Sequence, residues 1–172
     1  MMEILRPFGQ TNSAFSLTGN IVMDENKIRI HFKWKDPRSE VLLVSRGQSQ
    51  RADELWKTTC FEAFVQPLNS KHYWELNLSS SGNWNVYKFE DYRLPQLPKA
   101  DLEAQLTRML SADNEIDAEF RLPLGGGQHF RCGLSAVVEL KNAEKVYFAT
   151  HHAGAKPDFH LSESFILKRE FL

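Results

Sequence analysis

The residues best suited to chemistry occupy alternate positions in three neighbouring segments, residues 60–66, 72–79 and 83–90. One set of alternate positions is apolar and comprises Phe61, Ala63, Val65, Trp74, Leu76, Leu78, Trp84 and Val86. The other set, called the mixed face below, carries carboxylates, amides and aromatic rings and comprises Glu62, Phe64, Tyr73, Glu75, Asn77, Asn85, Tyr87 and Phe89. Because successive side chains of a strand point to opposite sides, we expect the apolar set in a core and the mixed face outside it.

The mixed face combines the two kinds of group that recognise a sugar. Aromatic rings stack on the apolar C–H faces of a pyranose, and carboxylates and amides hydrogen-bond its hydroxyls. Trp56 precedes Glu62 by six residues, and a bend near Thr58 and Thr59 would bring the indole ring close to the carboxylate. The plainer interpretation is a solvated outer sheet with Trp56 packed under a loop.

Glu62 and Glu75 are also candidates for an acid–base pair, because glycoside cleavage uses two carboxyl groups. Binding modules carry the same residues without catalysis, however. The sequence has no P-loop, dinucleotide-binding, nucleophile-elbow or HExxH motif. Cys60 and Cys132 have no CxxC partner, so they are expected to be small buried side chains rather than nucleophiles. We therefore assign no catalytic residue and no cofactor.

A second group of candidate residues lies between positions 151 and 160. It contains four side chains that can in principle bind a metal ion, namely His151, His152, Asp158 and His160. Lys156 would oppose a cation, and Gly154 and Pro157 indicate a loop. The expectation is a loop that lines a ligand pocket through His152, Lys156, Asp158 and His160, with a metal site as the alternative.

Composition sets the broad class of protein. The 172 residues predict one domain, 1–172, and their net charge of -1 argues against nucleic acid or an anionic membrane as a partner. No apolar run is long enough for a transmembrane helix, and no secretory signal is apparent at the N-terminus, so we expect a cytoplasmic location. Two cysteines do not make a disulfide scaffold. No feature of the sequence specifies an oligomeric state.

Strand signals cover most of the chain. The clearest is Lys27–Trp34, in which basic and apolar residues alternate. Further strands are expected at residues 41–44, 60–66, 72–79, 83–90, 116–122, 130–140, 145–150 and 164–168, with Gly125–Gly127 as a flexible turn. The short loops between residues 60 and 90 favour an antiparallel meander.

One segment has helical spacing instead. Leu102, Leu106, Met109 and Leu110 fall on one side of a helix that Asp101 could cap. Many strands with at most one short helix predict an all-β fold, an antiparallel β-sandwich of jelly-roll type.

Two blocks of the sequence resemble the DOMON-like domains, which are grouped with the family 9 carbohydrate-binding modules. The blocks are residues 53–64, which contain LWKTTCFEAF, and residues 72–87, HYWELNLSSSGNWNVY. Lys156–His160, KPDFH, matches a third block found in bacterial single-domain proteins of this kind. The resemblance covers about two-thirds of the chain.

The resemblance implies a β-sandwich with a cleft on one sheet, in which Trp56 stacks on a sugar and Glu62 binds its hydroxyls. Glu75 and Asn77 match the two polar positions of the following strand, although sugar-binding members carry arginine where Glu75 stands. A second stacking tryptophan is absent after Trp84, and Phe159 or His152 would have to replace it.

The sequence therefore predicts a non-catalytic domain that binds a saccharide or another small polyhydroxylated ligand. The predicted contact residues are Trp56, Glu62, Glu75, Asn77, Tyr87, His152, Lys156, Asp158 and His160. The alternatives are a haem- or metal-binding domain that uses the loop from His151 to His160, and a protein-interaction module that uses an exposed sheet face. Other DOMON members bind haem through Met and His, but only Met23 of the four methionines lies near a predicted strand.

Overall fold

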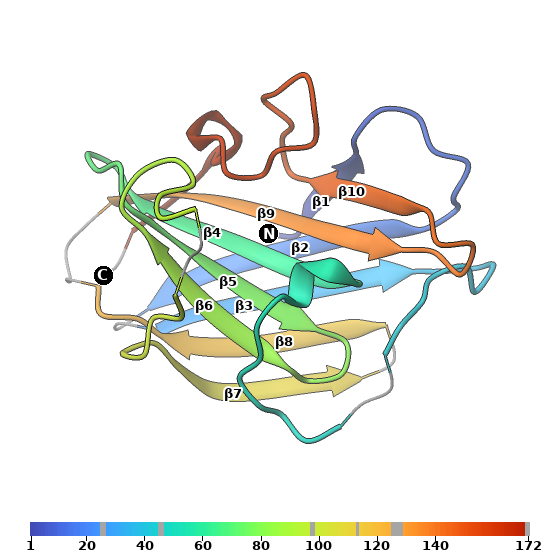
Figure 1. Ribbon diagram of the computed structural model, residues 1–172, viewed down its shortest axis with the longest axis horizontal. Helices are drawn as coiled ribbons and strands as arrows, with labels where there is room; N and C mark the ends of the chain where they lie inside the picture. Colours follow the sequence, from blue (N-terminus) through green and yellow to red (C-terminus); the bar gives the residue numbers. More distant parts are fainter. Residues whose placement is uncertain (25–26, 45–46, 97–98, 113, 125–128, 171–172) are drawn as a thin grey trace.

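The computed structural model describes residues 1–24, 27–44, 47–96, 99–112, 114–124 and 129–170. Within these residues the chain forms strands joined by loops and two short 3-10 turns (Figure 1). In chain order the elements are β1 (Glu3–Pro7), β2 (Ser16–Asp24), β3 (Lys27–Lys35), η1 (Leu55–Lys57), β4 (Cys60–Pro67), β5 (Tyr73–Ser79), β6 (Trp84–Phe89), β7 (Gln105–Ala112), β8 (Glu115–Arg121), β9 (His129–Glu139), β10 (Lys145–Ala149), η2 (Ser162–Ser164) and β11 (Leu167–Glu170). The protein is an all-β antiparallel sandwich, as the alternation of the sequence predicts.

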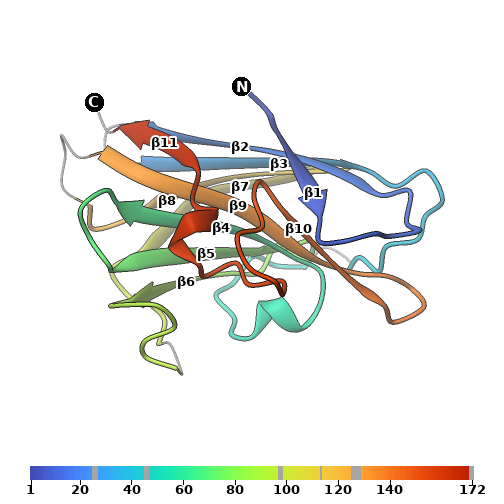
Figure 2. The same cartoon turned by 90° about the horizontal axis from the view of Figure 1, so that it is seen from above.

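The strands form one continuous sheet that folds over into two layers. Its order is β6-β5-β4-β9-β10-β1-β2-β3-β8-β7, and β11 pairs with β9 next to β10. The short β1 joins the layers, because its end pairs with β10 and its beginning with β2. In Figure 2 the layer with β2 and β3 lies above the layer with β4, β5 and β6.

The main core lies between the two layers and contains the apolar set predicted for it. Phe61, Ala63 and Val65 of β4 are fully buried there, and Leu76 and Leu78 of β5 lie beside them. The alternation of β3 is confirmed in the same way, because every second residue from Ile28 to Trp34 is buried in this core. A strand with one face in a core needs this period of two.

The mixed face lies on the outer side of the same layer, but it is not solvated. Both faces of β4 and β5 are buried, because η1 and the chain between β10 and β11 (residues 150–166, called the C-terminal segment) cover the outer side. A second apolar cluster forms under this cover from Phe64, Tyr73, Tyr87, Phe89, Val137, Ala149, Phe159 and Phe165, with Trp56 and Tyr147 packed against it. In Figure 2 the red C-terminal segment crosses over β4 and β9.

The prediction of a helix around residues 102–110 is wrong, because the segment forms a turn followed by strand β7. Leu106 pairs with Phe120 of β8 and Met109 pairs with Ala118, with a register shift between Leu106 and Arg108. The extra residue of this β-bulge lets two side chains three positions apart face the same core. The bulge thus gives Leu106 and Met109 the spacing expected in a helix. The other two residues of the predicted helix face, Leu102 and Leu110, are exposed.

The strand predicted at residues 41–44 is also absent. Val41 alone forms a bridge, with Leu140, and the Leu42 amide donates to the Glu139 carbonyl at 2.8 Å. Since β4 begins at Cys60, which pairs with Val137, only the last residues of β9 are free to accept this segment.

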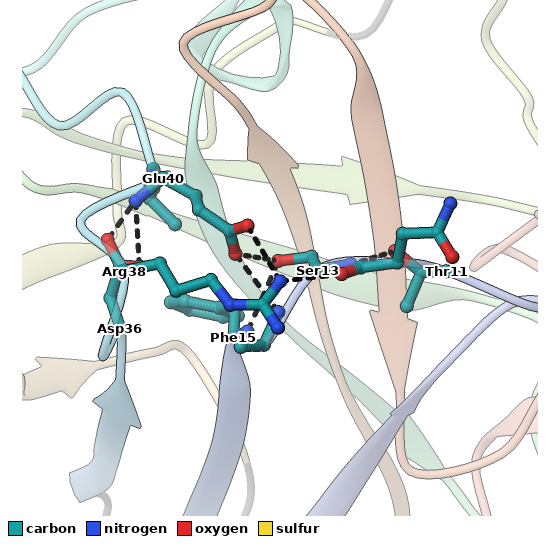
Figure 3. Close-up of polar contacts among 9 residues, drawn as sticks. Thr11, Ser13, Phe15, Asp36, Arg38 and Glu40 are labelled. Atoms are coloured by element: carbon teal, nitrogen blue, oxygen red, sulfur yellow. Dashed lines mark hydrogen bonds and ion pairs between the residues drawn. The ribbon is translucent and has the colours of Figure 1, made fainter.

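A carboxylate-centred turn holds this segment in place (Figure 3). The Asp36 carboxylate accepts hydrogen bonds from the backbone amides of Glu40 at 2.9 Å and Val41 at 3.0 Å. The Glu40 carboxylate in turn accepts from Ser13 Oγ at 2.9 Å and from the Ala14 amide at 3.0 Å. The loop before β2 and the loop after β3 are thereby joined at one end of the sandwich.

Most other predicted strands agree with the structure to within a few residues. The last one begins at Leu167 instead of Ser164, because residues 162–164 form the 3-10 turn η2. The predicted turn Gly125–Gly127 lies outside the described residues. Among the described residues there is no helix with the length and apolar character needed to cross a membrane.

Candidate functional site

A cavity of about 760 Å³ lies on the outer side of the layer that contains β4 and β5. Its floor belongs to the mixed face, and its walls come from η1, the loop after β6, β10 and the C-terminal segment. The lining residues are Trp56, Lys57, Glu62, Glu75, Phe89, Tyr92, Arg93, Leu94, Gln96, Val137, Lys145, Tyr147, Pro157, Phe159 and His160. The volume is typical of small-molecule sites, and the lining combines apolar and aromatic side chains with charged and polar ones.

Two buried acids, Glu62 and Glu75, lie in the floor with exposed fractions of 3% and 5%. They are diagonal neighbours on adjacent strands, since Glu62 faces Asn77 and Glu75 faces Phe64 in the register. Ser135 Oγ donates to Glu62 Oε2 at 3.2 Å, and Asn77 Nδ2 donates to Glu75 Oε1 at 2.9 Å. In the part of the chain that the structure describes, neither acid has a lysine or arginine ion pair.

Burial makes both acids hold a proton more tightly. It raises the pKa of Glu75 to about 7, against the opposing effects of the Asn77 hydrogen bond and the Arg93 charge. The pKa of Glu62 is raised well above its usual range, first by burial and then by the nearby Glu75 carboxylate. The ionised form of Glu75 thus disfavours ionisation of Glu62.

His160 lies beside Glu75 and is held there by a chain of hydrogen bonds from the loop after β6. The Arg93 backbone amide donates to Tyr73 Oη at 3.2 Å, and Tyr73 Oη lies 2.7 Å from His160 Nδ1. Burial, followed by the Arg93 charge, lowers the pKa of His160 to about 3, so its ring is neutral at pH 7. If the Tyr73 hydroxyl donates to Nδ1, the other nitrogen carries the hydrogen, and this Nε2 lies 3.6 Å from Glu75 Oε2.

Arg93 brings a guanidinium group to the cavity wall from the loop after β6. Arg93 Nη2 lies 2.9 Å from Asp158 Oδ1, and Tyr92 Oη donates to Asp158 Oδ2 at 2.5 Å. The backbone of Arg93 has a φ of 49°, in the left-handed region that non-glycine residues rarely adopt. Asp158 thus connects the C-terminal segment to a loop far away in the sequence.

Aromatic rings form the apolar part of the wall. Trp56 is half-buried on η1, and its ring meets the Tyr87 ring edge-on at 5.6 Å between centroids. Tyr147 of β10 and Phe159 of the C-terminal segment lie 6.1 Å apart. The indole therefore lies at the cavity and not in the core between the layers.

The structure brings four of the predicted site residues to one cavity, namely Trp56, Glu62, Glu75 and His160. Three others lie directly behind the lining. Asn77 is fully buried behind Glu75, Tyr87 Oη donates to Asp53 Oδ1 at 2.9 Å, and Asp158 holds the Arg93 side chain. These three residues position lining groups and do not themselves line the cavity.

His152 and Lys156 lie outside the cavity lining, contrary to the expectation for the C-terminal loop. His152 Nε2 donates to the Arg6 carbonyl at 2.9 Å, which turns the ring towards β1, and Lys156 is exposed. The alternative metal set, His151, His152, Asp158 and His160, is not assembled either. Nowhere in the described ranges do three His, Cys, Asp or Glu side chains gather into a group that could hold a metal ion.

Sequence patterns did not identify several of the lining residues, among them Arg93, Tyr147, Lys57 and Lys145. The resemblance offered one signal, because it implies an arginine at the position of Glu75. Arg93 supplies a guanidinium group to the same cavity from another element. Phe159, one of the two candidate replacements for a second stacking ring, does line the cavity.

The C-terminal segment packs closely against Gly133 of β9, and this contact gives a first prediction. A Cβ atom at Gly133 would lie 2.9 Å from Phe165 Cδ1 and 3.5 Å from the Ser164 carbonyl oxygen. We expect Gly133→Ala to lower the free energy of unfolding by about 1–3 kcal/mol, because the clash displaces a packed ring. Gly47→Ala is the matched control for denaturant unfolding, since its Cβ would meet no atom closer than 4.0 Å. Equal stability of the two variants would contradict this close packing.

The sequence itself matches no family model and no curated protein. Solved structures share its fold over nearly the whole chain. A candidate carbohydrate-binding protein from Bacteroides uniformis ATCC 8492 is 14% identical with a TM-score of 0.65, and the match covers 100% of this chain and 86% of that one.

Two further matches are structures of a family 9 carbohydrate-binding module from Caldicellulosiruptor kristjanssonii. The complex with cellotriose is 11% identical with a TM-score of 0.57, covering 99% of this chain and 82% of that chain. The complex with glucose is 10% identical with a TM-score of 0.58, covering 100% and 84%. At these identities the matches establish a common fold.

Proposed function

We propose that the protein is a non-catalytic domain that binds a carbohydrate, or another small polyhydroxylated ligand, in this cavity. The observation that carries the proposal is the convergence of one indole ring and two buried acids on the same hollow. A sugar presents apolar C–H faces and a rim of hydroxyls, and this lining offers a partner for each.

Each lining group has a definite part in the proposal. Trp56 stacks on one face of the ring, and Phe159 or Tyr147 packs against the other side. The acids Glu62 and Glu75 form hydrogen bonds with hydroxyls in the floor. Arg93 and the Nε2 group of His160 donate to ring or hydroxyl oxygens.

The common fold supports this choice of ligand class. The related structures contain cellotriose and glucose bound to a family 9 module. These two sugars are therefore the first probes, followed by a panel of other mono- and disaccharides.

Tryptophan emission gives a direct test, because Trp34 and Trp74 are buried in the main core while Trp56 lines the cavity. We expect a saturable change in emission, with dissociation constants in the micromolar to millimolar range, about -4 to -8 kcal/mol. Trp56→Ala should weaken binding by about tenfold or more in calorimetric titrations, about 1.4 kcal/mol.

Trp84→Phe is the control for this substitution. Trp84 packs under the Arg51 guanidinium, 4.2 Å from its ring centroid, and does not line the cavity. This variant should bind as the parent does. If no sugar in the panel gives heat or a change in emission, the proposed function is wrong.

A further inference from the structure

The floor of the cavity contains two buried acids, and in the described part of the chain neither of them forms an ion pair with a lysine or an arginine. Burial of an ionised carboxylate is unfavourable unless a cation or several hydrogen bonds compensate for lost water. Among the described residues, Glu62 receives one hydrogen bond, from Ser135, and Glu75 receives one, from Asn77. Behind the floor, Asn77 Oδ1 is buried without a hydrogen-bond partner in the same described residues. The arrangement thus leaves acceptor capacity unused at the bottom of an open cavity.

The charged groups around the floor are already engaged elsewhere. Arg93 pairs with Asp158 at 2.9 Å, and Lys57 pairs with Glu54 at 2.6 Å. Lys145 Nζ donates to the Lys57 carbonyl at 2.7 Å. His160 is the nearest basic group, but burial keeps its ring neutral. Tyr73 contributes only a neutral hydroxyl.

A bound cation would complete this floor, and the walls favour an organic cation over a metal ion. Hard metal ions need six or more oxygen ligands, whereas the described residues contain no three-residue metal-binding group. The cavity instead combines the acids with the rings of Trp56, Tyr147 and Phe159. Aromatic faces attract ammonium groups through cation–π interactions.

We propose that the natural ligand is an amino sugar, or a similar polyol with an ammonium group, whose cation lies between Glu62 and Glu75. This inference rests on the proposed function and specifies its ligand class. The ammonium group supplies a cation in direct contact with the floor and donates hydrogen bonds to the two carboxylates. The aromatic wall then contacts the carbon skeleton.

The lysines at the rim do not conflict with this arrangement. The Lys57 side chain is 62% exposed, and Lys145 is also exposed. Solvent and salt screen exposed charges, while interactions between buried groups are screened much less. The acids in the floor therefore dominate the selection of a bound ligand.

Calorimetric titration with four sugars of similar size tests the inference. Glucosamine carries the ammonium group, glucose and N-acetylglucosamine are neutral, and glucuronate carries a carboxylate. At pH 7 we expect glucosamine to bind at least about tenfold more tightly than glucose, because an opposite charge next to a carboxylate favours its ionised form. Glucuronate should bind most weakly.

Proton release provides a readout that is independent of affinity. Burial raises the proton affinity of both acids in the free protein, and an ammonium group would expel bound protons. Binding heats of glucosamine should therefore depend on the ionisation enthalpy of the buffer and show net proton release at pH 7. The heats of glucose should show much less.

Amide variants test whether the preference for glucosamine and the proton release both depend on Glu62 and Glu75. Glu62→Gln and Glu75→Gln retain the shape of the side chain, and each should reduce the preference for glucosamine to within about threefold of glucose. Glu144→Gln, in the exposed turn between β9 and β10, should retain the full preference.

The outcomes separate the two proposals. If neutral sugars bind as tightly as glucosamine without proton release, the ammonium inference is wrong and the proposed function stands. Tighter binding of glucuronate would also overturn the inference and assign ligand selection to the rim lysines. If none of the four sugars nor the wider panel binds, the proposed function itself fails.

Discussion

Replacing Glu75 with glutamine is expected to stabilise the protein at pH 8 by up to about 3 kcal/mol. The shift of the Glu75 pKa from 4.5 to about 7 in the folded state is the source of this gain. Each unit of difference between the folded and unfolded pKa corresponds to about 1.4 kcal/mol. Glutamine keeps an oxygen that can accept the hydrogen bond from Asn77 but carries no charge.

The direction of the pH dependence follows from proton binding. Below pH 4.5 Glu75 is protonated in both states and does not affect stability. Between pH 4.5 and about 7 the unfolded chain loses this proton while the folded protein retains it, so the free energy of unfolding falls as pH rises. The loss is complete above about pH 7, and Glu62 acts in the same direction.

Urea unfolding of the parent and of Glu75→Gln from pH 4 to pH 9 measures this effect. The two stability curves should coincide at pH 4 and separate progressively above it. Glu144→Gln should follow the parent within about 0.5 kcal/mol, as surface substitutions usually do. Parallel curves over the whole range would show that Glu75 ionises at its ordinary pKa, and the claim that burial raises this pKa would be wrong.

Replacing Phe165 with alanine is expected to lower the free energy of unfolding by about 3–5 kcal/mol, the usual range for a buried phenylalanine. Phe165 is 2% exposed, and its ring stacks on the Phe64 ring at 5.3 Å. It also contacts the Tyr73 ring at 5.8 Å, on the strand that carries Glu75. Phe165 therefore anchors the C-terminal segment to the mixed face.

The same substitution should also weaken ligand binding, because Pro157, Phe159 and His160 belong to the anchored segment and line the cavity. Hydrogen exchange of the backbone amides from residue 158 to 165 should accelerate in the folded protein. Ile166→Ala is the matched control, since Ile166 is adjacent but 51% exposed and should change stability little. A Phe165→Ala protein with unchanged exchange in this segment would contradict the anchoring role.

The alternation of polar and apolar residues was sufficient to predict the central strands and their two faces. In β4 and β5 the predicted core residues, such as Phe61 and Leu76, do face the core. Alternation repeats every two residues and is therefore visible within a single segment. The same local rule failed at β7, because a bulge between Leu106 and Arg108 gave a strand the spacing of a helix.

No local sequence pattern could predict that the mixed face is buried. Glu62 and Glu75 have the sequence context of an outer sheet, and the cover formed by η1 and the C-terminal segment, which is seated through Phe159 and Phe165, removes them from water. Their raised pKa values follow from this cover, because desolvation is a property of the assembled structure.

By itself, the sequence determined the β-sandwich class, most of the strands from β3 onward, and which side of β4 and β5 is rich in acids and rings. The tertiary structure alone decided that Arg93 joins Trp56, His160 and those acids at one cavity, and that His152 and Lys156 do not line it. The physical reason is that strand faces depend on neighbours two residues apart, whereas a cavity wall depends on the paths of loops. Those paths are fixed by contacts between distant segments, such as the ion pair of Arg93 with Asp158.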